Sequence, residues 1–290
     1  MPAIHVALTF DDKYWAPAYA TMRSICTSTE RRKDLVFHLL HRPLSAEHEE
    51  TLRRIETEFG AHLDFHLVDK DDRFTSLLAR APHDARPSIM YARLLLGSVL
   101  PADAERVVYF DCDMLIRAPI ERLAEMDLEG KALAAAPDYL GQLIMTGRDL
   151  IDTRGIFDPA MRYFNSGLLV IDVAKWRAAK VVDRFEEKMA DGTMQELYFD
   201  QDLLNLIFRG DWLELSQLWN FIDPRPWHEQ LNPHVLHYTG LRKPWQIRKG
   251  AAFARVYRYT MTNDVFYRYL AERSPAWLRP FVRLAKRFNG

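Results

Sequence analysis

The feature that most constrains this chain is the order of apolar segments in its first 110 residues, which alternate between strand and helix patterns. Short apolar runs typical of buried strands lie at Ile4–Phe10, Leu35–Leu40 and Val107–Phe110, and apolar residues alternate with polar ones at Leu63–Leu67, as in a further strand. Helical spacing of apolar residues marks Tyr14–Cys26, a segment after Ser45, and Ser88–Leu96. This alternation predicts a largely parallel sheet with right-handed crossovers and helices on both faces. Ligands of such sheets bind beyond the carboxyl ends of the strands.

The second predicted helix has clear signals at both ends. Ser45 is a favoured N-cap residue, and Glu47 and Glu49 lie in the first turn, where the helix dipole favours negative charge. Gly60 stands where a left-handed residue commonly ends a helix. The sequence therefore predicts a helix that begins after Ser45 and ends at Gly60.

The second half of the chain gives less regular patterns. Predicted there are a strand at Leu168–Ile171, a helix over Val173–Met189, a helix marked by Leu203–Phe208, and a strand at Val235–Tyr238. No repeat or low-complexity linker interrupts the chain before about residue 250. With 290 residues, 48% of them hydrophobic, we expect one α/β domain over residues 1–250 and a helical extension over residues 251–290.

Charge and cysteine content exclude several other classes of protein. A formal net charge of -1 argues against a nucleic-acid partner, since dedicated nucleic-acid binders usually carry a basic excess. Cys26 and Cys112 are far apart in sequence, which is typical of reduced thiols in a cytoplasmic protein. Residues 1–10 lack the pattern of a secretory signal, and no apolar run approaches the roughly 20 residues of a membrane-spanning helix. We therefore expect a cytoplasmic protein.

A pair of carboxylates follows the strand Val107–Phe110. Asp111 and Asp113 flank Cys112, and an apolar run comes directly after them. In an extended segment, residues i and i+2 point the same way, so the two carboxylates can converge on one point. Converging carboxylates raise each other's pKa unless a cation lies between them, and such oxygen ligands suit Mg²⁺ or Mn²⁺. Two ordinary loop acids at a strand end are the competing interpretation.

A strand followed by Asp-x-Asp has two common chemical uses. One is the nucleophile and acid of a haloacid-dehalogenase-like phosphatase, and the other is the metal clamp of a nucleotide-sugar transferase. The phosphatase pair normally lies on the first strand, with Thr or Val two places after the second Asp. Here the pair lies past residue 100, and the corresponding residue is Leu115. The sequence therefore favours the transferase.

Six motifs occur in one order along the chain. They are Asp11-Asp12-x-Tyr14, Tyr91-Ala92-Arg93-Leu94, Val108-Tyr109-x-Asp111-x-Asp113, Phe164-Asn165-Ser166-Gly167, Asp200-Gln201-Asp202 and His237-Tyr238-x-Gly240-x-x-Lys243-Pro244-Trp245. In these motifs, from about residue 4 to residue 245, the chain resembles the family 8 glycosyltransferases. This family includes bacterial lipopolysaccharide galactosyl- and glucosyltransferases and glycogenin.

The resemblance implies a GT-A fold, which is a Rossmann-like, mostly parallel α/β sheet that binds a nucleotide-diphospho-sugar. It also implies a UDP-sugar donor, Mn²⁺ as cofactor with Mg²⁺ as the alternative, and retention of the sugar's anomeric configuration. The donor would be UDP-glucose or UDP-galactose, and the acceptor a glycan or glycolipid such as lipopolysaccharide.

Metal and phosphate roles follow from matching positions. By resemblance, His237 joins Asp111 and Asp113 as a metal ligand, and an imidazole beside two carboxylates favours Mn²⁺ over Mg²⁺. His234 is the competing histidine. Gly240 would let the backbone approach the diphosphate closely, and Lys243 would offset the charge that develops as the glycosidic bond breaks.

The donor-binding roles also rest on the resemblance. Uridine would be contacted by Thr9, Asp11 and Tyr14, although Asp11 could equally be an N-cap. Cys112 is also expected to contact the donor. Arg93 would reach the donor sugar and brace the metal-binding acids. Sugar contacts are further implied for Asn165, Gly167, Asp200 and Gln201. Of these, Gln201 would lie near the anomeric carbon, and with Asp200 and Lys243 it forms the predicted catalytic set.

The C-terminal stretch alternates apolar and basic residues at helical spacing. From Trp277 to Phe288, residues such as Phe281 are interleaved with Arg279, Arg283 and others. Either a terminal helix packed on the domain or an amphipathic anchor for anionic lipid would explain this pattern. The second alternative would place the protein at the inner face of a membrane.

Two alternative functions remain open from the sequence. The first is a phosphoryl-transfer enzyme that uses the Asp pair, and the second is a UDP-sugar-binding protein without turnover. Neither the donor sugar nor the acceptor, linkage or oligomeric state follows from these residues.

Overall fold

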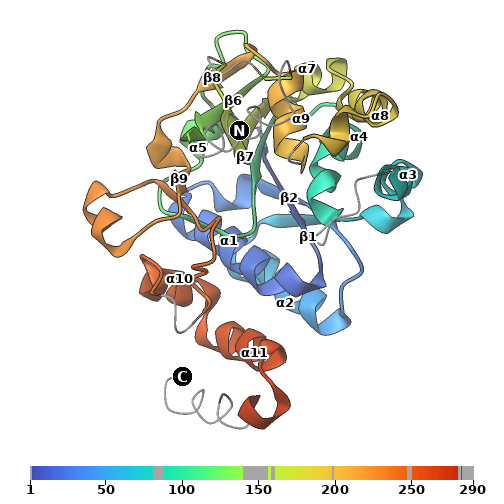
Figure 1. The fold of residues 1–290 in the computed structure, drawn as a ribbon. Coiled ribbons are helices and arrows are strands. Elements are labelled where there is room, and N and C mark those ends of the chain that lie inside the picture. The colour runs from blue at the N-terminus through green and yellow to red at the C-terminus, as the bar shows by residue number, and fades with distance from the viewer. Residues whose placement is uncertain are drawn as a thin grey trace.

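Figure 1 shows the computed structural model of the chain, which describes residues 2–80, 88–139, 156–157, 161–197, 199–246, 250–279 and 282. Its centre is a seven-stranded sheet. In spatial order the strands are β3 (His62–Leu67), β2 (Leu35–His41), β1 (Ile4–Phe10), β4 (Arg106–Phe110), β7 (Phe164–Asp172), β6 (Leu133–Pro137) and β8 (Trp212–Glu214).

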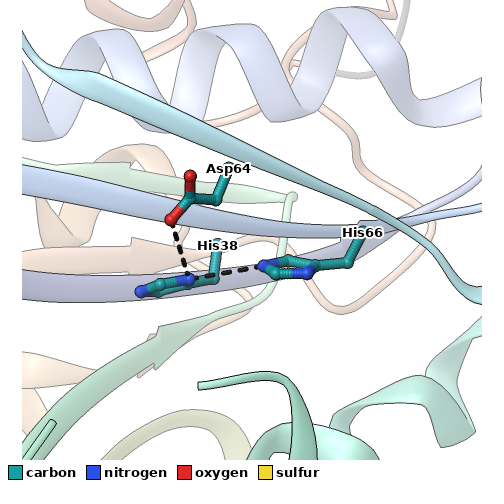
Figure 2. A group of neighbouring side chains, drawn as sticks. All are labelled: His38, Asp64 and His66. Atoms are coloured by element: carbon teal, nitrogen blue, oxygen red, sulfur yellow. Dashed lines mark hydrogen bonds and ion pairs between the residues drawn. The ribbon is translucent and has the colours of Figure 1, made fainter. Parts of the chain in front are cut away.

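The strand directions confirm a mostly parallel sheet with one exception. Strands β1 to β4 are mutually parallel where they pair, and β8 is parallel to β6. Strand β7 is antiparallel to both of its neighbours, β4 and β6. Its first residues therefore lie at the edge where the parallel strands end, beside the carboxylate pair. The register between β2 and β3 places His38 directly opposite Asp64, as Figure 2 shows.

Helices cover both faces of the sheet (Figure 1). The α-helices are α1 (Trp15–Ser28), α2 (Ala46–Phe59), α3 (Asp72–Arg80), α4 (Leu96–Val99), α5 (Glu121–Ala124), α7 (Val173–Ala178), α8 (Val181–Ala190), α9 (Phe199–Ile207), α10 (Ala254–Met261) and α11 (Asn263–Arg273). The 3₁₀ helices are η1 (Asp12–Tyr14), η2 (Arg32–Asp34), η3 (Val68–Lys70), η4 (Ser88–Leu95), η5 (Thr193–Gln195), η6 (Gln217–Trp219), η7 (Pro226–Leu231) and η8 (Ala276–Leu278).

The apolar core is divided between the two faces of the sheet. Alternate residues of β1 illustrate the division, since Val6 and Leu8 belong to one cluster and Ala7 to the other. The first cluster includes side chains of α1, α2, α10 and α11, whereas the second includes those of η4, α7, α8 and α9. This period of two is what a strand buried on both faces requires.

The predicted helix ends were correct for α2 and wrong for the helix over Val173–Met189. Ser45 accepts a hydrogen bond from the backbone N–H of His48, and Gly60 ends α2 with a φ of 72°. The segment after Val173 instead forms two helices, α7 and α8, because Lys180 adopts a left-handed conformation with a φ of 48° between them. The helix predicted at Ser88–Leu96 is mostly the 3₁₀ helix η4.

A second, three-stranded sheet was predicted only in part. It consists of β5 (Met114–Ile116), β10 (Val235–His237) and β9 (Phe221–Ile222), of which only β10 was expected from the sequence. Strand β10 is antiparallel to β5, and His237 pairs with Met114. This register brings His237 next to Asp113, which precedes β5.

The C-terminal helices pack on α1 (Figure 1). Trp15 donates a hydrogen bond from Nε1 to Glu272 over 3.1 Å, and the guanidinium of Arg268 lies 4.3 Å from a Trp15 ring. Tyr257 and Tyr269 are buried in the same apolar cluster as α1. Helices α10 and α11 therefore share the core of the sheet domain. Among the described residues, the longest apolar helices fall short of what a membrane crossing needs.

Candidate active site

Three distant chain segments meet at the carboxyl edge of the parallel strands. Asp111 and Asp113 follow β4, the backbone N–H of Asp111 bonds to the carbonyl of Gly167 at the start of β7, and His237 ends β10. Asn165 and Gly167, which precede the strand predicted at Leu168–Ile171, lie within the longer strand β7. The reversed direction of β7 is what brings them to this edge.

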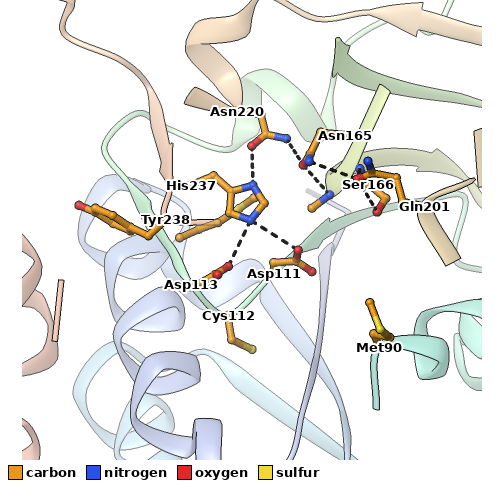
Figure 3. A network of polar contacts seen from close by, with 12 residues as sticks. Met90, Asp111, Cys112, Asp113, Asn165, Ser166, Gln201, Asn220, His237 and Tyr238 are labelled. Carbon is orange, nitrogen blue, oxygen red and sulfur yellow. Dashed lines mark hydrogen bonds and ion pairs between the residues drawn. The ribbon is translucent and has the colours of Figure 1, made fainter. Parts of the chain in front are cut away.

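The side chains of Asp111, Asp113 and His237 converge on one point (Figure 3). His237 Nε2 lies 3.2 Å from an oxygen of Asp113 and 3.6 Å from an oxygen of Asp111. One ligand atom from each residue lies within 4.8 Å of the other two. Burial alone would raise the pKa of Asp113, but His237 and Lys243 lower it well below its ordinary value. The site therefore presents a carboxylate in its ionised form.

The orientation of His237 suits a metal ligand. Its Nδ1 lies 2.9 Å from the side-chain oxygen of Asn220, and the Asn220 amide nitrogen donates to the oxygen of Asn165 over 2.8 Å. This chain of contacts places the imidazole proton on Nδ1 and leaves the Nε2 lone pair facing the carboxylates, as a metal ligand requires. The donor set of two carboxylates and one imidazole therefore fits a divalent cation.

Gly167 leaves space that any larger residue would fill. A Cβ at this position would lie 2.2 Å from Cε1 of His237 and 2.8 Å from an oxygen of Asp111. The resemblance assigned Gly167 to the donor sugar, whereas its close contacts in the structure are with two of the three converging residues. Gly240 differs, because a Cβ there would meet nothing nearer than an Asp223 oxygen at 3.4 Å.

Arg93 is buried beside the carboxylate pair and braces it. It donates to Asp111 over 3.1 Å and to the carbonyl of Ser166 over 2.8 Å, and its Nε lies 2.7 Å from Asp200. Burial would lower the pKa of Arg93, but Asp111 and Asp200 together raise it above its ordinary value. Burial raises the pKa of Asp200 to about 6 against the opposing effect of Arg93. Asp200 is 1% exposed, so its ion pair with Arg93 is buried.

Lys243 lies against the same carboxylates. Its ammonium donates to an oxygen of Asp113 over 2.6 Å and also to the carbonyl of Tyr238. The Asp113 oxygen that faces His237 is the other one, so Lys243 leaves it available. A positive charge is thereby held within reach of the point on which Asp111, Asp113 and His237 converge.

A cavity of about 180 Å³ lies beside the two carboxylates, Asp111 and Asp113, which form part of its lining. It is lined by Thr9, Phe10, Asp11, Tyr14, Ile89, Met90, Arg93, Asp111, Cys112 and Asp113. All the residues that the resemblance assigned to uridine lie in this lining. Phe10, Ile89 and Met90 could not be identified from the sequence, because apolar side chains of this kind are typical of core residues.

Two of these lining residues also have structural roles. Asp11 accepts a hydrogen bond from the backbone N–H of Lys13 over 3.0 Å, so the N-cap interpretation holds alongside its place in the cavity. Burial raises the pKa of the Cys112 thiol, and its sulfur lies 3.5 Å from the carbonyl of Thr9. Cys112 points away from His237 in Figure 3, and its thiol is held in the un-ionised form.

Gln201 lies at the centre of a network of amide and carboxyl groups. Its Oε1 accepts from the backbone N–H of Ser166 over 3.0 Å, and its Nε2 donates to Asp138 over 3.2 Å. Asn165 also donates to Asp138, over 3.0 Å. Asp138 and Asn220 were not predicted from the sequence as site residues. Asp138 follows the apolar β6 directly, which is a usable signal, whereas Asn220 between Trp219 and Phe221 gave none.

His234, the competing histidine, lies apart from this group. Its ring packs against Trp219 with the centroids 4.7 Å apart. The structure thus brings together Asp111, Asp113 and His237, with Asn165, Gly167, Gln201 and Lys243 around them. The functional roles assigned to these residues stay predictions.

A solved glycosyltransferase structure shares this architecture. The galactosyltransferase LgtC, solved with donor and acceptor sugar analogues, matches this structure with a TM-score of 0.74. The match covers 96% of this chain and 99% of that chain at 22% sequence identity, and it defines the GT-A fold. The predicted fold class is therefore confirmed.

The sequence matches the family described as "Glycosyl transferase family 8" over residues 5–248, and the chain belongs to this family. It is 26% identical over 266 residues to the probable galacturonosyltransferase-like 4 of Arabidopsis thaliana, covering 83% of this chain and 73% of that protein. It is 24% identical over 268 residues to the lipopolysaccharide 1,2-glucosyltransferase of Escherichia coli, covering 88% and 76%. The family defines a glycosyltransferase, with a nucleotide-sugar donor and a glycan acceptor.

Proposed function

We propose that this chain is a metal-dependent, retaining hexosyltransferase that transfers glucose or galactose from a UDP-sugar to a bacterial surface glycan such as lipopolysaccharide. The observation that carries the proposal is the convergence of Asp111, Asp113 and His237 at the rim of the cavity that holds Thr9, Asp11 and Tyr14. The named activity of the Escherichia coli relative supports a glucosyl donor and a lipopolysaccharide acceptor.

Asp111, Asp113 and His237 would hold the divalent cation. Two carboxylates with one imidazole favour Mn²⁺, and Mg²⁺ is the alternative. When bound, such a cation neutralises negative charge on the donor diphosphate. Asn220 keeps Nε2 of His237 free of a proton, and Arg93 and Tyr109, which donate to Asp111 over 3.1 and 2.8 Å, hold that carboxylate in position.

Lys243 supplies positive charge from the chain itself. Its ammonium is paired with Asp113 and lies against the Trp245 ring at 5.8 Å, so it is held in a fixed place. Negative charge that develops on the departing UDP is stabilised by a pre-positioned cation of this kind. Gly240, three residues earlier, would allow the backbone to approach the diphosphate.

For the donor nucleoside, we propose the cavity lined by Thr9, Asp11, Tyr14 and Cys112. One oxygen of Asp11 accepts from Lys13 N, so the other can accept from a uracil N–H or a ribose hydroxyl. Asn165 and Gln201 would contact the sugar, and Asp200 would act on it through Arg93.

Retention of configuration is best explained by same-face attack. Gln201 is a poor nucleophile, and its amide is held by Ser166 and Asp138. The leaving phosphate oxygen would then take the proton of the acceptor hydroxyl, so no side-chain base is needed. Asp138 is the carboxylate nearest this amide network that could instead form a covalent glycosyl-enzyme. Isolation of a sugar attached to Asp138 would overturn same-face attack.

The C-terminal stretch is proposed as a contact for an anionic membrane surface, with the enzyme at the inner face of the membrane. Most of Trp277–Phe288 lies outside the described residues, and Trp277 itself is 71% exposed. Full-length protein should sediment with anionic vesicles, whereas protein lacking residues 275–290 should stay in the supernatant. Equal sedimentation of both would overturn this contact.

The experiment that tests the function is UDP release from a panel of UDP-sugars with Mn²⁺, with EDTA, and in Asp113→Asn protein. The panel includes UDP-galacturonate, because one relative is named galacturonosyltransferase-like. We expect release from one donor, abolished by EDTA and by the substitution. Donor binding without release would indicate a binding protein without turnover. Hydrolysis of simple phosphate esters without any preference for UDP-sugars would support the phosphatase alternative, which family membership does not favour.

A further inference from the structure

A second group of metal-ligating side chains lies on strands β2 and β3, outside the candidate active site. His38 comes from β2, and Asp64 and His66 come from β3, the edge strand of the sheet. The three side chains project from the same face, because His38 is opposite Asp64 and Leu40 is opposite His66 in the register. Figure 2 shows the two imidazoles and the carboxylate turned toward one another.

One ligand atom from each of the three residues lies within 4.8 Å of the other two, and the two distances from His38 match neighbouring ligands of one small cation. His38 Nδ1 lies 3.4 Å from His66 Nε2 and 3.5 Å from an oxygen of Asp64. A well-formed hydrogen bond is shorter, at about 2.7 to 3.2 Å. Two ligands of a tetrahedral Zn²⁺, with bonds of about 2.0 to 2.2 Å, lie roughly 3.3 to 3.5 Å apart. The observed spacing is therefore that of neighbouring ligands of zinc.

Further histidines orient these ligands from outside. His5 Nδ1 lies 2.9 Å from His38 Nε2, so a proton on His38 Nε2 leaves the Nδ1 lone pair facing His66 and Asp64. His62 Nε2 lies 2.8 Å from the Asp64 oxygen that does not face His38. Hydrogen bonds to the second nitrogen of a ligating histidine and to a ligating carboxylate are typical of metal sites.

The group is partly exposed, so an ion can reach it, while one of its three ligands is fixed in the core. His38 is fully buried, which fixes one ligand in the core, whereas the side chain of Asp64 is 37% exposed and that of His66 is half-buried. Water can therefore reach the open side of the group and fill a fourth coordination position.

We propose that His38, Asp64 and His66 form a zinc site that joins the edge strand β3 to β2. The proposal is independent of the proposed transferase function, since none of these residues lines the active-site cavity. The two groups also differ in chemistry. Two imidazoles with one carboxylate favour Zn²⁺, whereas two carboxylates with one imidazole favour Mn²⁺. Because β3 pairs with β2 alone among the described strands, a cross-link to β2 would hold it against the sheet.

The test measures zinc bound to the untagged full-length chain carrying Asp113→Asn, which disables the first group. After equilibrium dialysis against Zn²⁺, metal analysis should find one zinc per chain. His66→Gln in the same background should weaken zinc binding by about 100-fold or more, because loss of a ligand costs at least as much as loss of an outer contact. His62→Gln should weaken it by about 10-fold, the lower end for an outer contact.

Two further measurements distinguish zinc binding at this site from unfolding of the variants and from adventitious zinc binding elsewhere on the chain. His228→Gln, a histidine substitution on η7, should leave the zinc content unchanged. Zinc should raise the thermal midpoint of the Asp113→Asn chain but not that of the chain with His66→Gln added. Equal zinc content with and without His66→Gln would overturn the proposal. So would the absence of zinc from the folded Asp113→Asn chain.

Discussion

At the scale of single residues, Gly167 is the position where the smallest change should disturb the active site most. In Gly167→Ala, the new methyl would overlap His237 and crowd Asp111. Displacement of reacting groups by about 1 Å can cost about 100-fold in rate, so we expect a loss of that order in UDP release. Mn²⁺ affinity, measured by calorimetry, should fall with it.

Gly240→Ala is the matched control for the Mn²⁺ affinity. Its Cβ would make only an ordinary contact with Asp223 at 3.4 Å and none with His237 or Asp111, so Mn²⁺ affinity should be unchanged. If Gly167→Ala binds Mn²⁺ as tightly as the unaltered chain, the methyl is accommodated and the close approach to His237 is unimportant for the metal.

Asn220 is a positioning residue that acts through His237. It is 2% exposed and accepts the Nδ1 proton of the imidazole, so Asn220→Ala should release the ring without touching the carboxylates. Loss of an outer contact of this kind costs about 10- to 100-fold in metal affinity. The Mn²⁺ concentration for half-maximal activity should rise by that factor, and excess Mn²⁺ should restore the maximal rate. Activity that stays low in excess Mn²⁺ would indicate a collapsed site.

At the scale of elements, the break between α7 and α8 depends on a strained backbone at Lys180. The left-handed conformation costs a non-glycine residue about 1 to 2 kcal/mol. Lys180→Gly should remove most of that cost, and even after the entropic penalty of glycine we expect a gain of about 1 kcal/mol, or roughly 2 °C in the thermal midpoint. Lys180→Ala keeps the Cβ and should give no gain. Equal midpoints for the two variants would mean that the backbone is unstrained.

The elements also show which features can be predicted from the sequence. Strands β1 and β2 and helices α1 and α2 have patterns long enough to identify, and α2 carries caps at both ends. Strands β5 and β9 have three and two residues, too few for a period to show. The reversed direction of β7 is decided by pairing with β4 and β6, which lie 27 or more residues earlier, and a local pattern carries no information about it.

The site was predictable to the extent that its residues stand in motifs. Asp111 and Asp113 could be chosen from residue chemistry alone, because two acids between apolar runs are unusual on a strand. His237 needed the family resemblance, since a single histidine after an apolar strand is commonly a core residue. Asn220 was identified neither from residue chemistry nor from the family resemblance, because its role depends on a contact with His237, 17 positions away.

At the scale of the whole molecule, buried imidazoles make the fold sensitive to acid. Burial lowers the pKa of several histidines, including His41, which packs between Phe10 and Phe65. The native state then binds fewer protons than the unfolded chain once the pH falls below about 6.5, so stability is lost as the pH falls through that range.

His41→Phe tests this sensitivity, because it keeps a ring between the two phenylalanines but cannot titrate. Urea unfolding in EDTA should show a shallower decline of the unfolding free energy between pH 7 and pH 5, by up to about 1.4 kcal/mol per pH unit. The remaining decline would come from the other buried histidines. Parallel curves for the variant and the unaltered chain would show that His41 does not contribute.

The contact between Trp15 and Glu272 spans 257 residues of sequence, and this has a consequence for synthesis on the ribosome. The face of α1 that α10 and α11 cover is therefore made well before the helices that cover it. At about 5 to 20 residues per second, the delay is roughly 13 to 50 s. During that interval we expect the nascent chain to expose Trp15 and its apolar neighbours, so this face needs protection from aggregation until α10 and α11 emerge.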